Sequence, residues 1–207
     1  MHLSFRELSE LADENNTTAH SFVEAQQEKI SKSFEILKSI NVRESIYGTS
    51  TGFGHNVNCH VEQLAAAGHQ KGLIRFLNVG RGEAFKASVV RRALRIQAIK
   101  LAQGYSGIHP ETLNKLLNLS DQNSLPLVPQ RGSLGASGDL IPMAHAVKPM
   151  FFGSNAIAES RLGPRDALAL VNTNAFMLSF LLEQICEFEK FIEKSYDFVL
   201  DADISAG

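Results

Sequence analysis

The stretch from Asp166 to Leu200 constrains the fold of this chain most, because it runs without a glycine or proline after Pro164. It is rich in leucine, phenylalanine and glutamate, and it holds no residue that breaks a helix. One continuous helix of this length exceeds the helices of ordinary globular domains and is typical of helical bundles. The pattern therefore predicts a bundle in which apolar faces of this helix are covered by other subunits.

Helical spacing recurs through the rest of the chain, and strand alternation is weak everywhere. Val23, Ile30, Phe34 and Leu37, for example, form one apolar stripe at helical spacing. The chain is therefore predicted to be all-α and to form a single domain over residues 1–207. The segments predicted to be helical before the long C-terminal element are 3–15, 21–40, 61–80, 83–104 and 109–120.

The helix over residues 83–104 is the clearest of these. An apolar stripe along it is opposed by a basic stripe, which is the pattern of an amphipathic helix. The apolar stripe consists of Val89, Ala93, Ile96 and Ile99, and the basic stripe of Lys86, Arg91, Arg92 and Arg95.

Charge and composition exclude several classes of partner. The 207 residues are 44% hydrophobic, which is enough to fill a sizeable core. Lysine and arginine number 20 against 22 acidic residues, so the formal net charge is −2. This balance gives no electrostatic reason to expect binding to nucleic acid or to an anionic membrane.

The cysteines and the apolar runs indicate a cytoplasmic protein. Cys59 and Cys186 are the only cysteines, and the N-terminal residues MHLSFRELSELADENN lack the apolar core of a signal peptide. The two cysteines are therefore predicted to be reduced thiols. The longest apolar run, AFMLSFLLEQICEF, is interrupted by Glu183, Gln184 and Glu187, so no membrane span is predicted.

A run of small residues, RGSLGASGDLIPMAHA at 131–146, lies between the predicted helices. Such a run can serve as a bend, can offer backbone donors to a phosphate, or can react with itself. It fails the G-x-S-x-G nucleophile elbow, because Asp139 stands at the second glycine. The chain contains no G-x-x-x-x-G-K-[ST] sequence, so the run is no P-loop either.

The possibility that the run reacts with itself is based on Ala136, Ser137 and Gly138. Gly138 has no side chain, so its nitrogen can approach the carbonyl carbon of Ala136 and close a five-membered ring. Loss of two water molecules, one of them from the Ser137 hydroxyl, leaves an exocyclic methylidene, which is an electrophile. Asp139 begins a predicted helix with Pro142 in its first turn, and a helix N-terminus beside the ring withdraws electron density from it.

A second glycine-rich stretch, YGTSTGFG, begins at Tyr47. Taken alone, it reads as a tight connection whose aromatic side chains pack locally. Four residues near it, His55, Cys59, His60 and His69, match no standard zinc spacing, so no metal site is predicted.

Together, GSLGASGDLIPMAHA and YGTSTGFG resemble the two signature stretches of the aromatic amino acid ammonia-lyases and aminomutases. The stretches SGI, HQKGLIRFLNVG and ALALVN add to the resemblance, which covers nearly the whole chain but only the N-terminal part of that family. It implies the long-helix, fumarase/aspartase-like fold and a homotetramer-like assembly. It also implies a methylidene-imidazolone (MIO) group formed from Ala136, Ser137 and Gly138, and no metal.

The resemblance also implies roles for single residues. Tyr47 matches the tyrosine that acts as acid and base over the substrate, and Asn172 matches the asparagine beside the MIO group and the substrate carboxylate. Phe76 and Leu77 fall where the family senses the substrate ring. An apolar pair packs a bare phenyl ring and cannot bond an imidazole or a phenol, which favours phenylalanine, converted to trans-cinnamate and ammonia.

The sequence departs from the family at several places. Thr173-Asn174 stand where the family usually shows Gly-Thr, and Thr49-Ser50 also differ from the histidine lyases. The segment between MAHA and ALALVN is shorter than usual. The family's carboxylate-binding arginine and second tyrosine come from regions that have no counterpart here. Two hypotheses stay open: an ammonia-lyase or aminomutase completed by a second half or partner chain, or a catalytically silent relative that serves assembly or binding.

Overall fold

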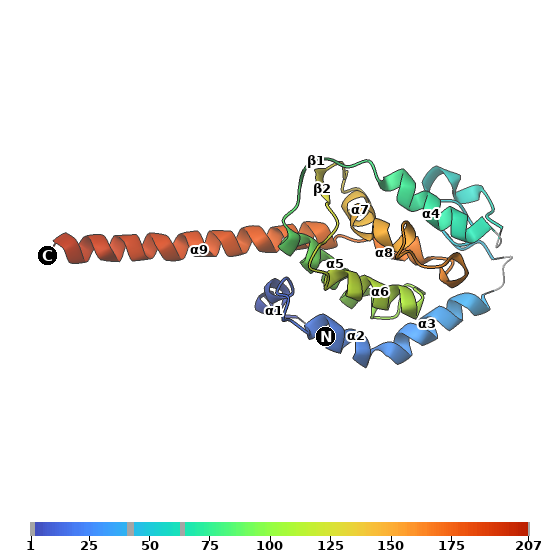
Figure 1. The fold of residues 1–207 in the computed structure, drawn as a ribbon, viewed down its shortest axis with the longest axis horizontal. Helices are drawn as coiled ribbons and strands as arrows, with labels where there is room; N and C mark the ends of the chain where they lie inside the picture. Colours follow the sequence, from blue (N-terminus) through green and yellow to red (C-terminus); the bar gives the residue numbers. More distant parts are fainter. Residues whose placement is uncertain (1–2, 41–43, 63–64, 207) are drawn as a thin grey trace.

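The computed structural model describes residues 3–40, 44–62 and 65–206, with side chains up to residue 198, and it is mainly helical (Figure 1). This confirms the predicted all-α class. In chain order the elements are α1 (Phe5–Glu10), α2 (Thr18–Ala25), α3 (Gln27–Ser39), the 3-10 turn η1 (Gly54–Asn58), α4 (Ala66–Leu77), β1 (Arg81–Ala84), α5 (Ala87–Leu101), α6 (Pro110–Ser120), β2 (Pro129–Arg131), α7 (Leu140–Phe151), the 3-10 turn η3 (Glu159–Arg161), α8 (Asp166–Val171) and α9 (Ala175–Ala206).

Helix α5 lies at the centre of the helical body and packs against α2, α6 and α9. Its Val89, Ala93 and Leu94 belong to one continuous apolar core that extends through α4, α6, α7 and α8. The stripe predicted from the sequence is therefore buried at Val89 and Ala93. The helix α6 begins at Pro110, as its position in the sequence predicted.

The basic stripe of α5 differs from a solvated face, because Arg91, Arg92 and Arg95 are all buried. Each guanidinium donates to main-chain carbonyl oxygens of neighbouring segments: Arg95 reaches Leu11 O at 2.9 Å, and Arg92 reaches Ser179 O at 3.0 Å. These bonds satisfy buried carbonyls that helical periodicity does not reveal.

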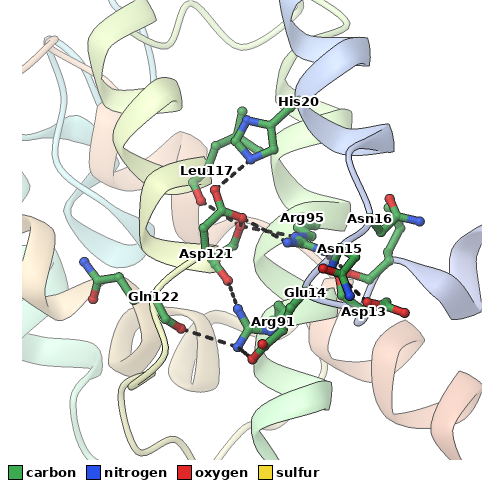
Figure 2. Close-up of polar contacts among 12 residues, drawn as sticks. Asp13, Glu14, Asn15, Asn16, His20, Arg91, Arg95, Leu117, Asp121 and Gln122 are labelled. Atoms are coloured by element: carbon green, nitrogen blue, oxygen red, sulfur yellow. Dashed lines mark hydrogen bonds and ion pairs between the residues drawn. The ribbon is translucent and has the colours of Figure 1, made fainter.

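Carboxylates at the edge of the body complete the arginine network (Figure 2). Asp121 accepts from Arg95 at 2.9 Å and lies 2.7 Å from the Nε2 of His20, and Glu14 pairs with Arg91 at 3.0 Å. Partial burial acts to raise the pKa of Asp121, but its contacts with Arg95 and His20 together outweigh burial and lower that pKa. The network ties the N-terminal segment to α5 and to the end of α6.

The prediction of one long C-terminal helix from Asp166 is wrong in one respect, because the helix is interrupted at residues 172–174, between α8 and α9. Thr173 Oγ1 accepts from the Ala175 amide at 3.0 Å, and Asp139 Oδ2 accepts from the Met177 amide at 2.7 Å. These two bonds cap a new helix start. No glycine or proline marks the break, which depends on a residue distant in sequence.

Helix α9 leaves the body and projects as a single long rod (Figure 1). Large apolar side chains lie exposed on it, and they are Met177, Phe180, Leu181, Phe188, Phe191, Ile192, Tyr196 and Phe198. Residues Asp166–Phe198 are also long and apolar enough to cross a membrane by length and composition, but half of their most apolar 18-residue window is buried, as in a core helix. This is weak evidence for a membrane span.

A two-stranded antiparallel sheet was not predicted. β1 pairs with β2 through Arg81 opposite Arg131 and Ala84 opposite Pro129. Strands this short carry no readable alternation. The sheet brings the start of the glycine-rich run beside the segment after α4, where a Cβ on Gly132 would lie 3.2 Å from the Cα of Gly80.

Candidate active site

The backbone at Gly138 is pressed against the helix break. Gly138 has φ of +97°, and a Cβ there would lie 2.3 Å from the carbonyl oxygen of Thr173. The next amide, that of Asp139, donates to the same oxygen at 2.5 Å. Both the left-handed backbone and the close approach exclude any residue other than glycine.

The chain makes a tight turn immediately before this contact. Bridges join Gly138 to both Gly135 and Ala136, and the Gly138 amide points to the Gly135 carbonyl at 3.5 Å. The turn therefore folds Gly138 back on the residues that precede Ser137. Ala136 and Ser137 are exposed, and α7 begins two residues after Gly138.

Asp139 connects the starts of two helices. It occupies the N-cap position of α7, and its buried carboxylate accepts from the third amide of α9. A carboxylate at a helix N-terminus interacts favourably with the helix dipole. The sequence marked Asp139 only as a helix start, so its role in α9 was missed.

Tyr47 lies on the loop between α3 and η1, and its hydroxyl oxygen accepts from the Gly54 amide at 2.9 Å. Its ring meets Phe53 edge to face, with 6.4 Å between ring centroids. Gly48, next to it, has φ of +70°, and a Cβ there would lie 2.5 Å from Leu168 Cδ2. The loop is thus packed directly on α8, and 44% of Tyr47 remains exposed.

Gln70 fixes this loop to α8. Its Nε2 donates to Gly48 O at 3.2 Å and to Pro164 O at 2.8 Å, and its Oε1 accepts from the Ala167 amide at 2.9 Å. Gln70 is fully buried, so these bonds compensate the loss of water. The sequence marked the surrounding HQKGLIRFLNVG stretch, but Gln70 itself was not predicted as a residue of the site.

Helix α8 joins the two glycine-rich segments. The Tyr47 loop packs on its Leu168, and the chain just beyond its end, at Thr173, packs on Gly138. Asn172 caps the C-terminal end of α8 and is exposed, and its carbonyl accepts from Lys100 Nζ at 2.8 Å. No hydrogen bond among the described residues joins Tyr47 directly to residues 136–138.

The structure places Phe76 and Leu77 in different surroundings. Phe76 is 77% exposed on α4, whereas Leu77 is 8% exposed and belongs to the core. The pair is thus not presented together on one surface. The contact of this pair with a substrate ring stays a prediction. In this conformation only Phe76 is exposed enough to contact a ring directly.

Two histidines support the site without forming a metal centre. Phe53 stacks on His69 at 4.2 Å, and burial lowers the pKa of His69. His145 Nε2 accepts from the Gly80 amide at 3.0 Å, and burial, together with the charge of Lys148, lowers the pKa of His145. Within the described ranges, no group of three or more histidine, cysteine or acidic residues could hold a metal ion.

Solved structures define the class of this fold. The phenylalanine aminomutase of Pantoea agglomerans matches 94% of this chain with a TM-score of 0.78 at 23% identity. A tyrosine aminomutase from Streptomyces globisporus matches 86% with a TM-score of 0.69 at 25% identity. These matches take in only 40% and 36% of the two solved chains. The fold is therefore that of the N-terminal part of the aminomutases and ammonia-lyases.

The chain belongs to the aromatic amino acid lyase family, which it matches over residues 3–196. It is 39% identical to the histidine ammonia-lyase of Gloeobacter violaceus over 62% of its own length and 28% of that enzyme. It is 31% identical to a probable histidine ammonia-lyase of Thermoplasma acidophilum over 77% of its length and 36% of that protein. The chain spans about a third of the length of these curated relatives.

Proposed function

We propose that this chain is the MIO-bearing part of an ammonia-lyase for an aromatic L-amino acid, with phenylalanine converted to trans-cinnamate and ammonia. The observation that carries the proposal is the turn at residues 136–138. It folds Gly138 back toward Ala136 and holds it against Thr173, where only glycine fits. An Ala-Ser-Gly turn that is anchored in this way beside a helix start has no evident use as a simple bend.

The residues present fit formation of the ring. The Gly138 nitrogen attacks the Ala136 carbonyl carbon, and the carbonyl oxygen leaves as water with one hydrogen from each of the Gly138 and Ser137 nitrogens. Ser137 then loses its hydroxyl and its Cα hydrogen as a second water. The anchoring of Gly138 restricts the turn to conformations in which these atoms are near one another. Once formed, the group supplies an electrophile that makes the substrate ammonium a better leaving group.

Tyr47 and Asn172 would bind and orient the substrate. The Tyr47 phenol is held by the Gly54 amide, which donates to the oxygen that would take the β-proton of the substrate. Asn172, on the segment that contacts Gly138, is exposed and can offer its amide to the substrate carboxylate.

Phe76 favours phenylalanine as the substrate. It is the exposed member of the predicted pair, and its ring can stack on a phenyl group but cannot bond an imidazole. The curated relatives reported above are named for histidine, which makes histidine the competing substrate. An aminomutase that returns the amino group to the β-carbon is the alternative reaction, since solved aminomutases share this fold.

We further propose that the working protein is a cytoplasmic homo-oligomer, tetramer-like, whose site is completed by a second half or a partner chain. The exposed apolar side chains of α9 support this, since such a series on one projecting helix is costly in water. A catalytically silent relative serving assembly is the competing class.

Turnover tests the proposal. The chain, purified together with the second half or partner chain that completes its site, is given L-phenylalanine, L-histidine or L-tyrosine in separate reactions, and the products are identified by mass spectrometry. We expect trans-cinnamate from L-phenylalanine and its loss in Tyr47→Phe. Release of urocanate from L-histidine instead would overturn the assignment of phenylalanine as the substrate. Formation of β-phenylalanine would favour the aminomutase reaction over the lyase reaction. Absence of product from all three amino acids would favour a catalytically silent relative.

A further inference from the structure

A small pocket lies between the C-terminal end of α5 and one side of α8. Its volume is about 280 Å³. Two basic side chains, Lys100 and Arg165, line it together with the apolar side chains of Leu101, Leu168 and Ala169. None of the described residues that line the pocket is an aspartate or a glutamate. The pocket therefore combines positive charge with apolar surface.

Lys100 lacks a counter-charge in this pocket. Its Nζ donates to the main-chain carbonyl of Asn172 at 2.8 Å, and it makes no ion pair with a carboxylate among the described residues. Partial burial lowers the pKa of Lys100. An ammonium group has three donors, so two remain for a ligand.

Two further groups in the pocket can hold an anion, and a third can cover an apolar group. Arg165 is partly buried and makes no ion pair within the described part of the chain. The Ser106 hydroxyl, also in the lining, is shielded from water and has no hydrogen-bond partner among those residues. Tyr105 lines the same pocket and is 92% exposed, so its ring is free to cover a bound apolar group.

We propose that this pocket binds a small arylcarboxylate, with the carboxylate held by Lys100, Arg165 and Ser106 and the aryl ring against Leu101, Leu168 and Tyr105. A carboxylate satisfies the cations and the buried hydroxyl at once. An inorganic anion would leave the apolar lining in contact with water, so the lining favours a ligand with an apolar body. Asn172, proposed above to bind the substrate carboxylate, also lines the pocket, but neither Tyr47 nor Ser137 does, so binding here requires neither the ring nor turnover.

Calorimetry of the purified chain with benzoate, against its uncharged analogue benzamide, tests the site. We expect benzoate to bind and benzamide not to bind. Lys100→Met and Arg165→Gln should each weaken benzoate by roughly tenfold, the loss of one charge-assisted hydrogen bond. Lys32→Met, which removes an exposed lysine on α3, is the matched control and should leave benzoate binding unchanged.

Ser106→Ala separates a ligand role from a structural one. Because the hydroxyl has no hydrogen-bond partner among the described residues, its removal should not lower the melting temperature, but it should weaken the binding of benzoate. Ser137→Ala should bind benzoate like the wild type. The proposal is overturned if benzamide binds as tightly as benzoate, if the charge variants bind benzoate normally, if benzoate does not bind, or if Ser137→Ala loses binding.

Discussion

The amide of Asp139 donates to the carbonyl of Thr173 at 2.5 Å, while the Asp139 carboxylate accepts from the amide of Met177 at 2.7 Å. One residue thus holds the glycine-rich turn and the start of α9 together. Because Gly138 contacts the same Thr173 carbonyl, the turn that would form the ring and the break in the C-terminal helix depend on each other.

Gly138→Ala should prevent closure of the ring. The added Cβ would meet the Thr173 oxygen at 2.3 Å, and the backbone at φ +97° is strained for alanine. Gly135→Ala is the matched control, because Gly135 has φ of +71° but open space around its Cβ. Intact mass should show an unmodified Gly138→Ala chain and a dehydrated Gly135→Ala chain. Dehydration of both would disprove the role given to the Thr173 contact.

Asp139→Ala should destabilise the chain by about 1–2 kcal/mol, the usual cost of removing a helix cap. Asp139→Asn should cost less, because an amide oxygen can still accept from Met177. Urea unfolding followed by circular dichroism measures both, with Asp197→Ala on the exposed part of α9 as control. If Asp139→Ala unfolds at the same urea concentration as the control, the carboxylate does not cap α9.

Asp166 is a second buried carboxylate, and its oxygens accept from the His109 amide at 2.9 Å, the Thr112 hydroxyl at 2.5 Å and the Gly163 amide at 2.8 Å. Burial raises its pKa in spite of these bonds. Asp166→Ala leaves the donors unpartnered, so we expect a loss of about 2–4 kcal/mol in the free energy of unfolding. An unchanged free energy in urea titrations would show that the donors find water instead.

The stability of the chain should fall in mild acid because of His145. Burial lowers the pKa of His145 below its ordinary 6.5, so the unfolded state binds the proton more readily. The contribution of His145 to stability is therefore complete above pH 6.5 and is lost as the pH falls through the lowered pKa. Unfolding free energies measured across this range should show the decline.

The variant Lys148→Met tests the contribution of the Lys148 charge to the lowered pKa of His145. Removal of the nearby positive charge should raise the pKa of His145 and shift its titration, followed by NMR of the imidazole, to higher pH. A titration that moves to lower pH, or does not move, would contradict the effect assigned to Lys148.

The sequence was informative where structure is local. Helical spacing located α5, and a proline at its first position marked α6. Helical spacing did not reveal the burial of Arg95, because its partners are carbonyls in the N-terminal segment. The break after Val171 was missed for the same reason: Asp139, which caps α9, lies 38 residues before Met177.

The candidate site shows the same division. Both glycine-rich stretches were recognised in the sequence by their composition and by their resemblance to the signature stretches of a family. The contacts that require glycine at Gly48 and Gly138 were not predicted, because Leu168 and Thr173 lie far away in sequence. The linkage through Gln70 was not predicted either, because Gln70 bonds to a carbonyl 94 residues away at Pro164. The different exposure of Phe76 and Leu77 likewise depends on which face of α4 packs on the core. That face could not be predicted from the position of the two residues in the sequence.

Intact mass spectrometry of the purified chain, beside Ser137→Ala, tests the central claim most directly. The wild type should be lighter than its encoded sequence by two water molecules, and Ser137→Ala should have its encoded mass, because alanine has no hydroxyl to lose. A wild-type chain at its full encoded mass would contradict the account. The turn at Ala136, Ser137 and Gly138 would then be a structural bend, and the chain a silent member of its family.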